Sequence, residues 1–458
     1  MKRKEFLYFL VAALATLPGI VLRLAGLQWP PAAMAIISGV AILGASFLLL
    51  WACDAAQADI SQSLALAVVA LVAVLPEYAV DMYFTWEAGK HPEGDYAHYA
   101  IANMTGANRL LIGVAWAVIV LLHWLRTRRA VRLEKDRRTE LLFLGLATVY
   151  AFVIPLKGSL AWYDGLVYLG LYGWYIVVAG RRPCVESPAE GPAELLIHLP
   201  KVKRRVLTAM MFLFAAAAIA ANAEPFCEGL VATGKALHIN EFLLVQWLAP
   251  LASEAPEFTV AVVFAWRGQA GLALGSLLSS KLNQWTLLVG MIPGVFAVSH
   301  GTLDHPLPMD ERQMQEILLT AAQSLLAVLL LAGRRLALSG ALLLFVLFTG
   351  QLVAPSLVEA FPSLVPKGVE ASQMHWLFSG LYLAAAAAVF LQHPKRPFGL
   401  LSGAQVGEQP MASKSTSNAA AVPCCGRTEA QAAEEFKSPH CATCEYRLRA
   451  KRTEVNGG

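Results

Sequence analysis

Long apolar stretches recur along the whole chain, and they constrain its fold more than any other feature. A helix that crosses a membrane needs roughly 20 mainly apolar residues. On that rule the sequence predicts about twelve crossings, near 5–27, 32–53, 60–88, 96–124, 139–157, 161–180, 206–234, 241–267, 271–297, 315–333, 336–354 and 373–392. Only 15% of the 458 residues are charged, against about 25% in an ordinary soluble domain. We therefore expect an all-α polytopic membrane protein in contact with the lipid bilayer.

Lys and Arg residues predict the orientation of these spans, because cytoplasmic loops hold an excess of them. With twelve spans, the basic clusters all fall on one side, at 2–4, 126–138, 181–205, 267, 334–335 and 395–396. The opposite loops hold only isolated Lys or Arg residues. The charge pattern therefore predicts a multi-pass protein of the cytoplasmic (inner) membrane with both termini in the cytoplasm. The net charge of +4 gives no reason to expect a nucleic-acid partner.

Two segments of the chain match each other without a gap. Residues 75–86 and 255–266 share a Pro-Glu-aromatic triplet, a Val, a Phe and a Trp, and residues 100–108 match 273–281 more weakly. Under the predicted orientation, the helix with Glu77 runs outward and the helix with Glu257 runs inward. Inverted repeats of this kind are a common plan of secondary transporters, which bind their substrate near the midplane between the repeats. The sequence therefore predicts two inverted-topology repeats.

The predicted organisation follows from these spans and repeats. It consists of an extra N-terminal span (1–31), a first inverted repeat (32–180), a basic cytoplasmic linker (181–205), a second inverted repeat (206–360), an extra C-terminal span (361–396) and a cytoplasmic tail (397–458).

Glu77 and Glu257 each follow a proline well inside a predicted span. A carboxylate within the membrane is costly and marks a functional site by default. The proline frees backbone carbonyls that can face a cavity, and carboxylates with carbonyls suit a hard cation such as calcium. The alternative is that each glutamate only makes a structural hydrogen bond between helices. Because the two glutamates occupy matched positions of a repeat, that interpretation is the weaker one.

Asp81 lies on the same helix face as Glu77, and Glu254 lies on the same face as Glu257. Each is either a third carboxylate of the site or a proton carrier, and for Asp81 a place near the outer interface is an equal alternative.

Arg109 and Lys281 lie in the helices that follow the two Pro-Glu helices, at depths where a cation needs a partner. We expect both to be counter-charges in the transport pathway, paired with the carboxylates above. The alternative is that their side chains reach to the membrane interface. Serines, an asparagine and a glutamine flank Lys281 between 279 and 284, a polar face that favours a cavity.

The tail from 397 onward lacks membrane character and holds a group of metal-ligand side chains. These are Cys424, Cys425, His440, Cys441 and Cys444. Their types and local spacing are those of a structural zinc site, and the alternative is a set of unpaired cysteines in a flexible tail. We expect no cofactor for the membrane part.

The two Pro-Glu helices and the helices after them resemble the alpha repeats of the sodium/calcium exchanger (cation/calcium antiporter) superfamily. In that superfamily each repeat carries Thr-Ser-x-Pro-Glu and then Gly-Asn-x-x-Gly-Ser-Asn, ending in a further Asn or Asp. The resemblance covers 60–124 and 241–297 and implies that Glu77 and Glu257 bind the cation. It implies further that Ser253 and Ser280 are hydroxyl ligands. Asn103, Gly106 and Asn108 retain the motif of the first repeat, and the resemblance implies that Asn103 and Asn108 also bind the cation.

The chain departs from that pattern at several ligand positions. The family's residues are replaced by apolar or different polar residues at Ala73, Val74, Ala107, Leu111, Glu254, Lys281 and Gln284.

The resemblance implies a secondary active antiporter that exchanges calcium or another cation against protons or sodium by alternating access. The missing hydroxyls favour proton coupling. The alternative is a non-transporting membrane sensor or scaffold that signals through its cysteine-containing tail. No His-Glu-x-x-His or Gly-x-Ser-x-Gly motif favours an enzyme.

Overall fold

The computed structural model describes residues 2–27, 29–56, 59, 74–134, 137–180, 192–238, 240–360 and 373–402. In the first half the elements are α1 (Lys2–Ala25), α2 (Pro31–Ala56), α4 (Leu75–Lys90), α5 (Tyr96–Leu110), η1 (Leu111–Ala115), α6 (Trp116–Thr127), β1 (Val131–Arg132), α7 (Arg138–Ala151), α8 (Val153–Lys157) and α9 (Trp162–Ala179). In the second half they are α10 (Ala193–Ile197), α11 (Lys201–Leu237), α12 (Glu241–Trp266), α13 (Ala270–Asn283), η3 (Gln284–Leu288), α14 (Val289–His300), α15 (Glu311–Leu331), β2 (Arg335–Leu336), α16 (Leu338–Ala360), α17 (Met374–Gln392) and α18 (Lys395–Ser402). The predicted zinc ligands and the first part of the predicted span 60–88 lie outside the described residues.

Ten helical segments of the described chain are long and apolar enough to cross a membrane. Large apolar side chains such as Leu156 and Leu213 stand exposed on their outer faces, as expected where the surrounding solvent is lipid. The predicted all-α polytopic fold is therefore confirmed. The other two predicted crossings correspond to α4, with 16 described residues, and α9, with 18. The count of twelve stays a prediction.

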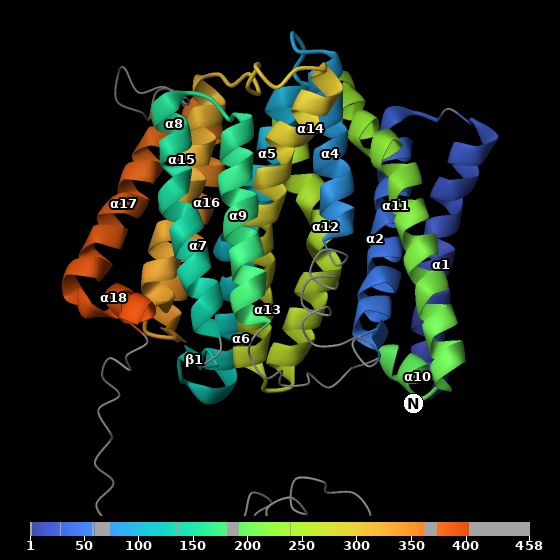
Figure 1. Cartoon of the computed structure of the whole chain (residues 1–458), viewed down its shortest axis with the longest axis horizontal. Helices are drawn as coiled ribbons and strands as arrows, with labels where there is room; N and C mark the ends of the chain where they lie inside the picture. The colour runs from blue at the N-terminus through green and yellow to red at the C-terminus, as the bar shows by residue number, and fades with distance from the viewer. Residues whose placement is uncertain are drawn as a thin grey trace, which may run out of the picture. The chain divides into compact units, whose positions relative to one another are not determined.

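The basic segments gather at one end of the helices. Figure 1 shows the N-terminus, α10, β1 and α18 at that end and α8 at the other. The two short strands pair antiparallel there, with Arg132 opposite Arg335. The loop charges alone identify this end as the cytoplasmic one, so the orientation in the membrane stays a prediction.

Two outer groups of helices lie on either side of a central group. Helices α1, α2 and α11 pack together on one side, and α15, α16 and α17 pack together on the other, with α4, α5, α12 and α13 between them (Figure 1). The crossing of α5 and α12 depends on Gly106, because a Cβ atom there would lie 2.0 Å from the backbone oxygen of Gln246. Small residues of this kind let two membrane helices approach to backbone contact.

Both matched copies contain a π-helical turn at the same place. Helix α5 becomes π-helical at Leu111 and α13 becomes π-helical at Gln284, each three residues after the matched pair Asn108 and Lys281. Such turns are rare and occur frequently at functional sites. The two copies therefore share a backbone irregularity as well as residues, although their inverted relation stays a prediction.

Candidate functional site

The two matched glutamates meet at one small cavity. Its lining residues come from α4, α12 and η3 and from the residue before α4; they are Val74, Pro76, Glu77, Ser253, Glu254, Glu257 and Gln284. The cavity volume is about 10 Å³, which corresponds to a single water-sized occupant. Three carboxylates from two distant segments of the sequence therefore surround a space for one small ligand.

Glu77 lies in the first turn of the described part of its helix, and its predicted place well inside a span stays a prediction, because residues 60–73 lie outside the described residues. The described part of α4 starts at Leu75, and Pro76 stands in its first turn. Proline is tolerated there because the first turn leaves its N–H groups without helical acceptors. Glu77 is nevertheless buried, with 3% of its surface exposed. Within the described part of the chain, its Oε1 atom has no hydrogen-bond partner.

Glu257 and Glu254 lie in the interior of α12 and have polar partners. The Ser280 hydroxyl of α13 donates to Oε2 of Glu257, and Nε2 of Gln284 donates to Oε1 of Glu254 at 2.7 Å. Ser253 also lines the cavity, and its hydroxyl lies 3.3 Å from the carbonyl oxygens of Ala249 and Pro250 in its own helix. The second copy therefore supplies most of the polar side chains of the site.

Asp81 and Asn103 form a separate buried pair that does not line the cavity. The Nδ2 atom of Asn103 donates to Oδ1 of Asp81 at 2.9 Å, and neither residue has any exposed surface. Helix α5 packs against α4 and covers this turn of the helix. Whether Asp81 also lies near the outer interface stays a prediction.

Lys281 meets its own matched residue from the other copy. Its Nζ atom donates to Oδ1 of Asn108 at 2.6 Å and lies 4.4 Å from the ring centre of Trp285. Both Lys281 and Asn108 are fully buried. The hydrogen bond of Lys281 therefore goes to an amide oxygen of α5, and its predicted role as a counter-charge of the carboxylates stays a prediction. This contact already uses the Asn108 oxygen that the family resemblance assigns to a cation.

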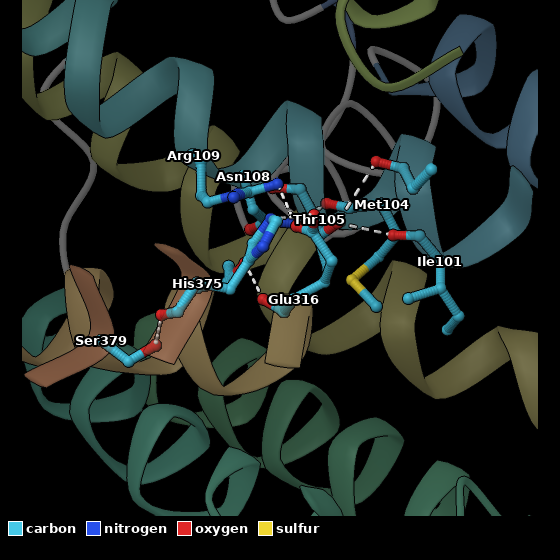
Figure 2. A network of polar contacts seen from close by, with 10 residues as sticks. Ile101, Met104, Thr105, Asn108, Arg109, Glu316, His375 and Ser379 are labelled. Atoms are coloured by element: carbon cyan, nitrogen blue, oxygen red, sulfur yellow. Dashed lines mark hydrogen bonds and ion pairs between the residues drawn. The ribbon is translucent and has the colours of Figure 1, made fainter. Parts of the chain in front are cut away.

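Arg109 is buried and pairs with a carboxylate that the sequence did not single out. Its guanidinium group contacts Glu316 of α15 (Figure 2). Only 1% of Arg109 is exposed, so both the predicted partners and the alternative of reaching to the interface are wrong. Glu316 was missed because it lies at the start of a predicted span, where an acidic residue is ordinary. The signal that could have found it is a second intramembrane acid available to neutralise Arg109.

Known proteins that resemble this chain were found with a family model and among curated proteins. The family model described as sodium/calcium exchanger protein matches residues 31–180 and 207–356, which together make up more than half of the chain. CaxA of Alkalimonas amylolytica is 29% identical over 186 residues, which are 38% of this chain. That alignment covers 55% of CaxA, so the chain spans about half the length of this curated relative.

Two solved structures resemble the fold. The crystal structure of the H⁺/Ca²⁺ exchanger CAX has a TM-score of 0.80 and 40% identity, covering 87% of this chain and 97% of CAX. The structure of native YfkE has a TM-score of 0.52 and 14% identity, covering 84% of this chain and 99% of YfkE, and shows likeness of fold alone. Together with the two Pro-Glu segments that meet at the cavity, these matches show that the chain belongs to the sodium/calcium exchanger protein family.

Proposed function

We propose that the protein is a secondary active antiporter that exchanges calcium against protons by alternating access. The observation that carries this proposal is that Glu77 of the first copy and Glu257 of the second line the same cavity. Family membership supports cation exchange, and calcium is the first candidate because a 40% identical structure is that of an H⁺/Ca²⁺ exchanger.

The chemistry of the cavity supports a divalent cation. Its wall contains the carboxyl groups of Glu77, Glu254 and Glu257, and calcium prefers oxygen ligands from carboxylates and carbonyls. A group of buried carboxylates is costly unless a cation or protons neutralise it. A site that requires one or the other at all times can exchange them, because release of the cation favours uptake of protons.

The contact of Lys281 supports proton coupling over sodium coupling. Its ammonium group is covalently part of the chain, unlike a bound ion, and it hydrogen-bonds to the Asn108 oxygen where the two copies meet. A bound sodium ion would need that oxygen and the hydroxyls that are missing at Val74 and Ala107. We therefore expect the lysine ammonium to take the place of a coupling cation.

Calcium flux in proteoliposomes tests the proposal directly. Purified protein is reconstituted, and uptake is followed under an imposed pH gradient, an imposed sodium gradient, or neither, with the membrane potential held at zero. We expect the pH gradient to drive calcium uptake and the sodium gradient to have no effect, and a proton ionophore serves as the control that abolishes the drive. Sodium-driven, pH-insensitive exchange would contradict proton coupling. An absence of cation flux under all conditions would favour the scaffold alternative, which no feature of the described residues supports.

A further inference from the structure

A buried charge network joins three helices beside the transport site (Figure 2). Glu316 of α15 lies between two partners. Its Oε2 atom contacts Arg109 of α5, and its Oε1 atom lies 2.9 Å from Nε2 of His375 in α17. The side chains of Arg109 and Glu316 are 2% and 1% exposed, and that of His375 is 15% exposed. An ion pair buried to this extent is screened very little, so the loss of one partner leaves an uncompensated charge.

The same network contacts α5 directly before the π-helical turn of the first copy. The Arg109 guanidinium lies 5.3 Å from the ring centre of Trp247 in α12. Nε2 of Gln323 in α15 donates to the Arg109 carbonyl oxygen at 3.3 Å, two residues before the turn begins at Leu111. A π-helical turn disturbs the regular sequence of backbone hydrogen bonds, and a side chain from a neighbouring helix can satisfy a carbonyl there. Helix α15 therefore contacts both the side chain and the backbone of Arg109.

Arg109 links this network to the hydrogen bond between Asn108 and Lys281. It directly follows Asn108, whose amide oxygen accepts the hydrogen bond of Lys281. The Asn108 amide group also donates to the Met104 carbonyl at 2.7 Å, so the side chain is fixed relative to α5. A displacement of Arg109 along or around α5 would therefore move the acceptor of Lys281.

We propose that Glu316 and His375 are positioning residues of the transport site. They hold Arg109, and through it Asn108 and Lys281, in the geometry that ion exchange requires. Helix α17 lies beyond residue 356, where the family match ends, and by this inference it is nevertheless part of the transport unit. The inference rests on the proposed antiport function.

A double-mutant cycle tests whether Arg109 and Glu316 act as a unit. Glu316→Gln, Arg109→Gln and the combined variant are compared in calcium uptake, in the pH profile of uptake and in thermal melting. We expect each single variant to lower the uptake rate at least about tenfold and to alter the pH profile, because one buried charge is left alone. The combined variant should return to within about threefold of the unmodified protein, since two neutral amides can hydrogen-bond to each other.

Two further variants separate positioning from a general loss of stability. Asp164→Asn breaks another ion pair, which the fully buried Asp164 forms with the partly exposed Lys157 at the α8–α9 corner, and should lower the melting temperature without changing the pH profile. His375→Gln keeps a hydrogen-bond donor and should stay within about threefold of the unmodified rate, whereas His375→Leu should resemble Glu316→Gln. If Glu316→Gln does not fold, the inference is tested by comparing the two His375 variants and the combined variant with the unmodified protein.

The outcomes distinguish this inference from the function on which it rests. If the unmodified protein moves no cation, the proposed function fails and the inference fails with it. If the unmodified protein transports and the combined variant is no better than the poorer single variant, the positioning role alone is wrong. Normal rates and pH profiles in Glu316→Gln and Arg109→Gln would overturn it as well.

Discussion

The two matched copies differ in the polar residues that they place around their glutamates. At the positions that match Glu254, Ser280 and Gln284 of the second copy, the first copy has only the apolar residues Val74, Ala107 and Leu111. Glu257 consequently accepts a hydrogen bond from Ser280 of its own copy, whereas the polar side chains that line the cavity with Glu77 all come from the second copy. The first copy thus contributes one carboxylate to the cavity, and the second copy contributes the other polar groups.

The following helices differ in the same way. Asn108 of the first copy offers an oxygen, and the matched Lys281 of the second offers an ammonium group that binds it. Arg109 of the first copy pairs with Glu316, while its match in the second copy is the buried Leu282. The comparison teaches that a duplicated fold does not require a symmetric site, because complementary substitutions can join the two copies directly.

The largest expected effect comes from removing either charge of the glutamate pair. Glu77→Gln and Glu257→Gln should each abolish calcium uptake while leaving expression and melting largely intact, because the amide preserves the shape and lacks the charge that offsets cation dehydration. Glu87→Gln, at the C-terminal end of α4 beside Lys90, is the matched control and should transport normally. Normal uptake in both cavity variants would exclude this cavity as the site.

The next largest effect is expected where the copies differ in charge. Lys281→Asn makes the second copy like the first at this position, and it should flatten the pH profile and lower pH-driven uptake about tenfold. Lys235→Gln, in the last turn of α11, removes one positive charge away from the site and serves as control. An unchanged pH profile in Lys281→Asn would separate the lysine from proton coupling.

Neighbouring serines allow a finer test of the polar half of the site. Ser280→Ala removes the donor to Glu257 and should weaken the apparent calcium affinity about tenfold, since a hydrogen bond to a charged group contributes about 1.5–3 kcal/mol. Ser279→Ala changes the adjacent hydroxyl, which bonds to the Gly275 carbonyl and accepts from Arg137, and should leave the affinity unchanged. Equal effects of the two variants would place the Ser280 hydroxyl outside the binding site.

The smallest effect is expected at the basic end, where the copies touch through α2 and α11. Hydrogen bonds from Arg204 and Arg205 lower the pKa of Asp59, just after α2, to about 2. Because the folded pKa is lowered, this contact stabilises the protein above the unfolded pKa of about 3.9 and is lost as the pH falls through about 2. Asp59→Asn should lower the melting temperature by about 1–2 °C at neutral pH without changing calcium uptake. A loss of uptake would give this contact a role in transport.

The sequence by itself determined the class of fold and the two glutamates that share the cavity. Both follow from local patterns, since the length of an apolar stretch predicts a span and a repeated Pro-Glu triplet marks equivalent positions. The described helices agree with those patterns, while the zinc site in the tail and the inverted relation of the repeats stay predictions. The sequence also indicated that Arg109 and Lys281 need partners within the membrane.

Only the tertiary structure decided which partners they have. Glu316 is 207 residues from Arg109 and Asn108 is 173 residues from Lys281, and many other polar residues are equally available along the chain. The physical reason is that burial fixes the need for a partner, whereas its identity depends on which helices cross and at which turn. Gly106 sets the contact of α5 with α12, and the packing of α15 against α5 brings Glu316 to Arg109. No local pattern in the sequence records those crossings.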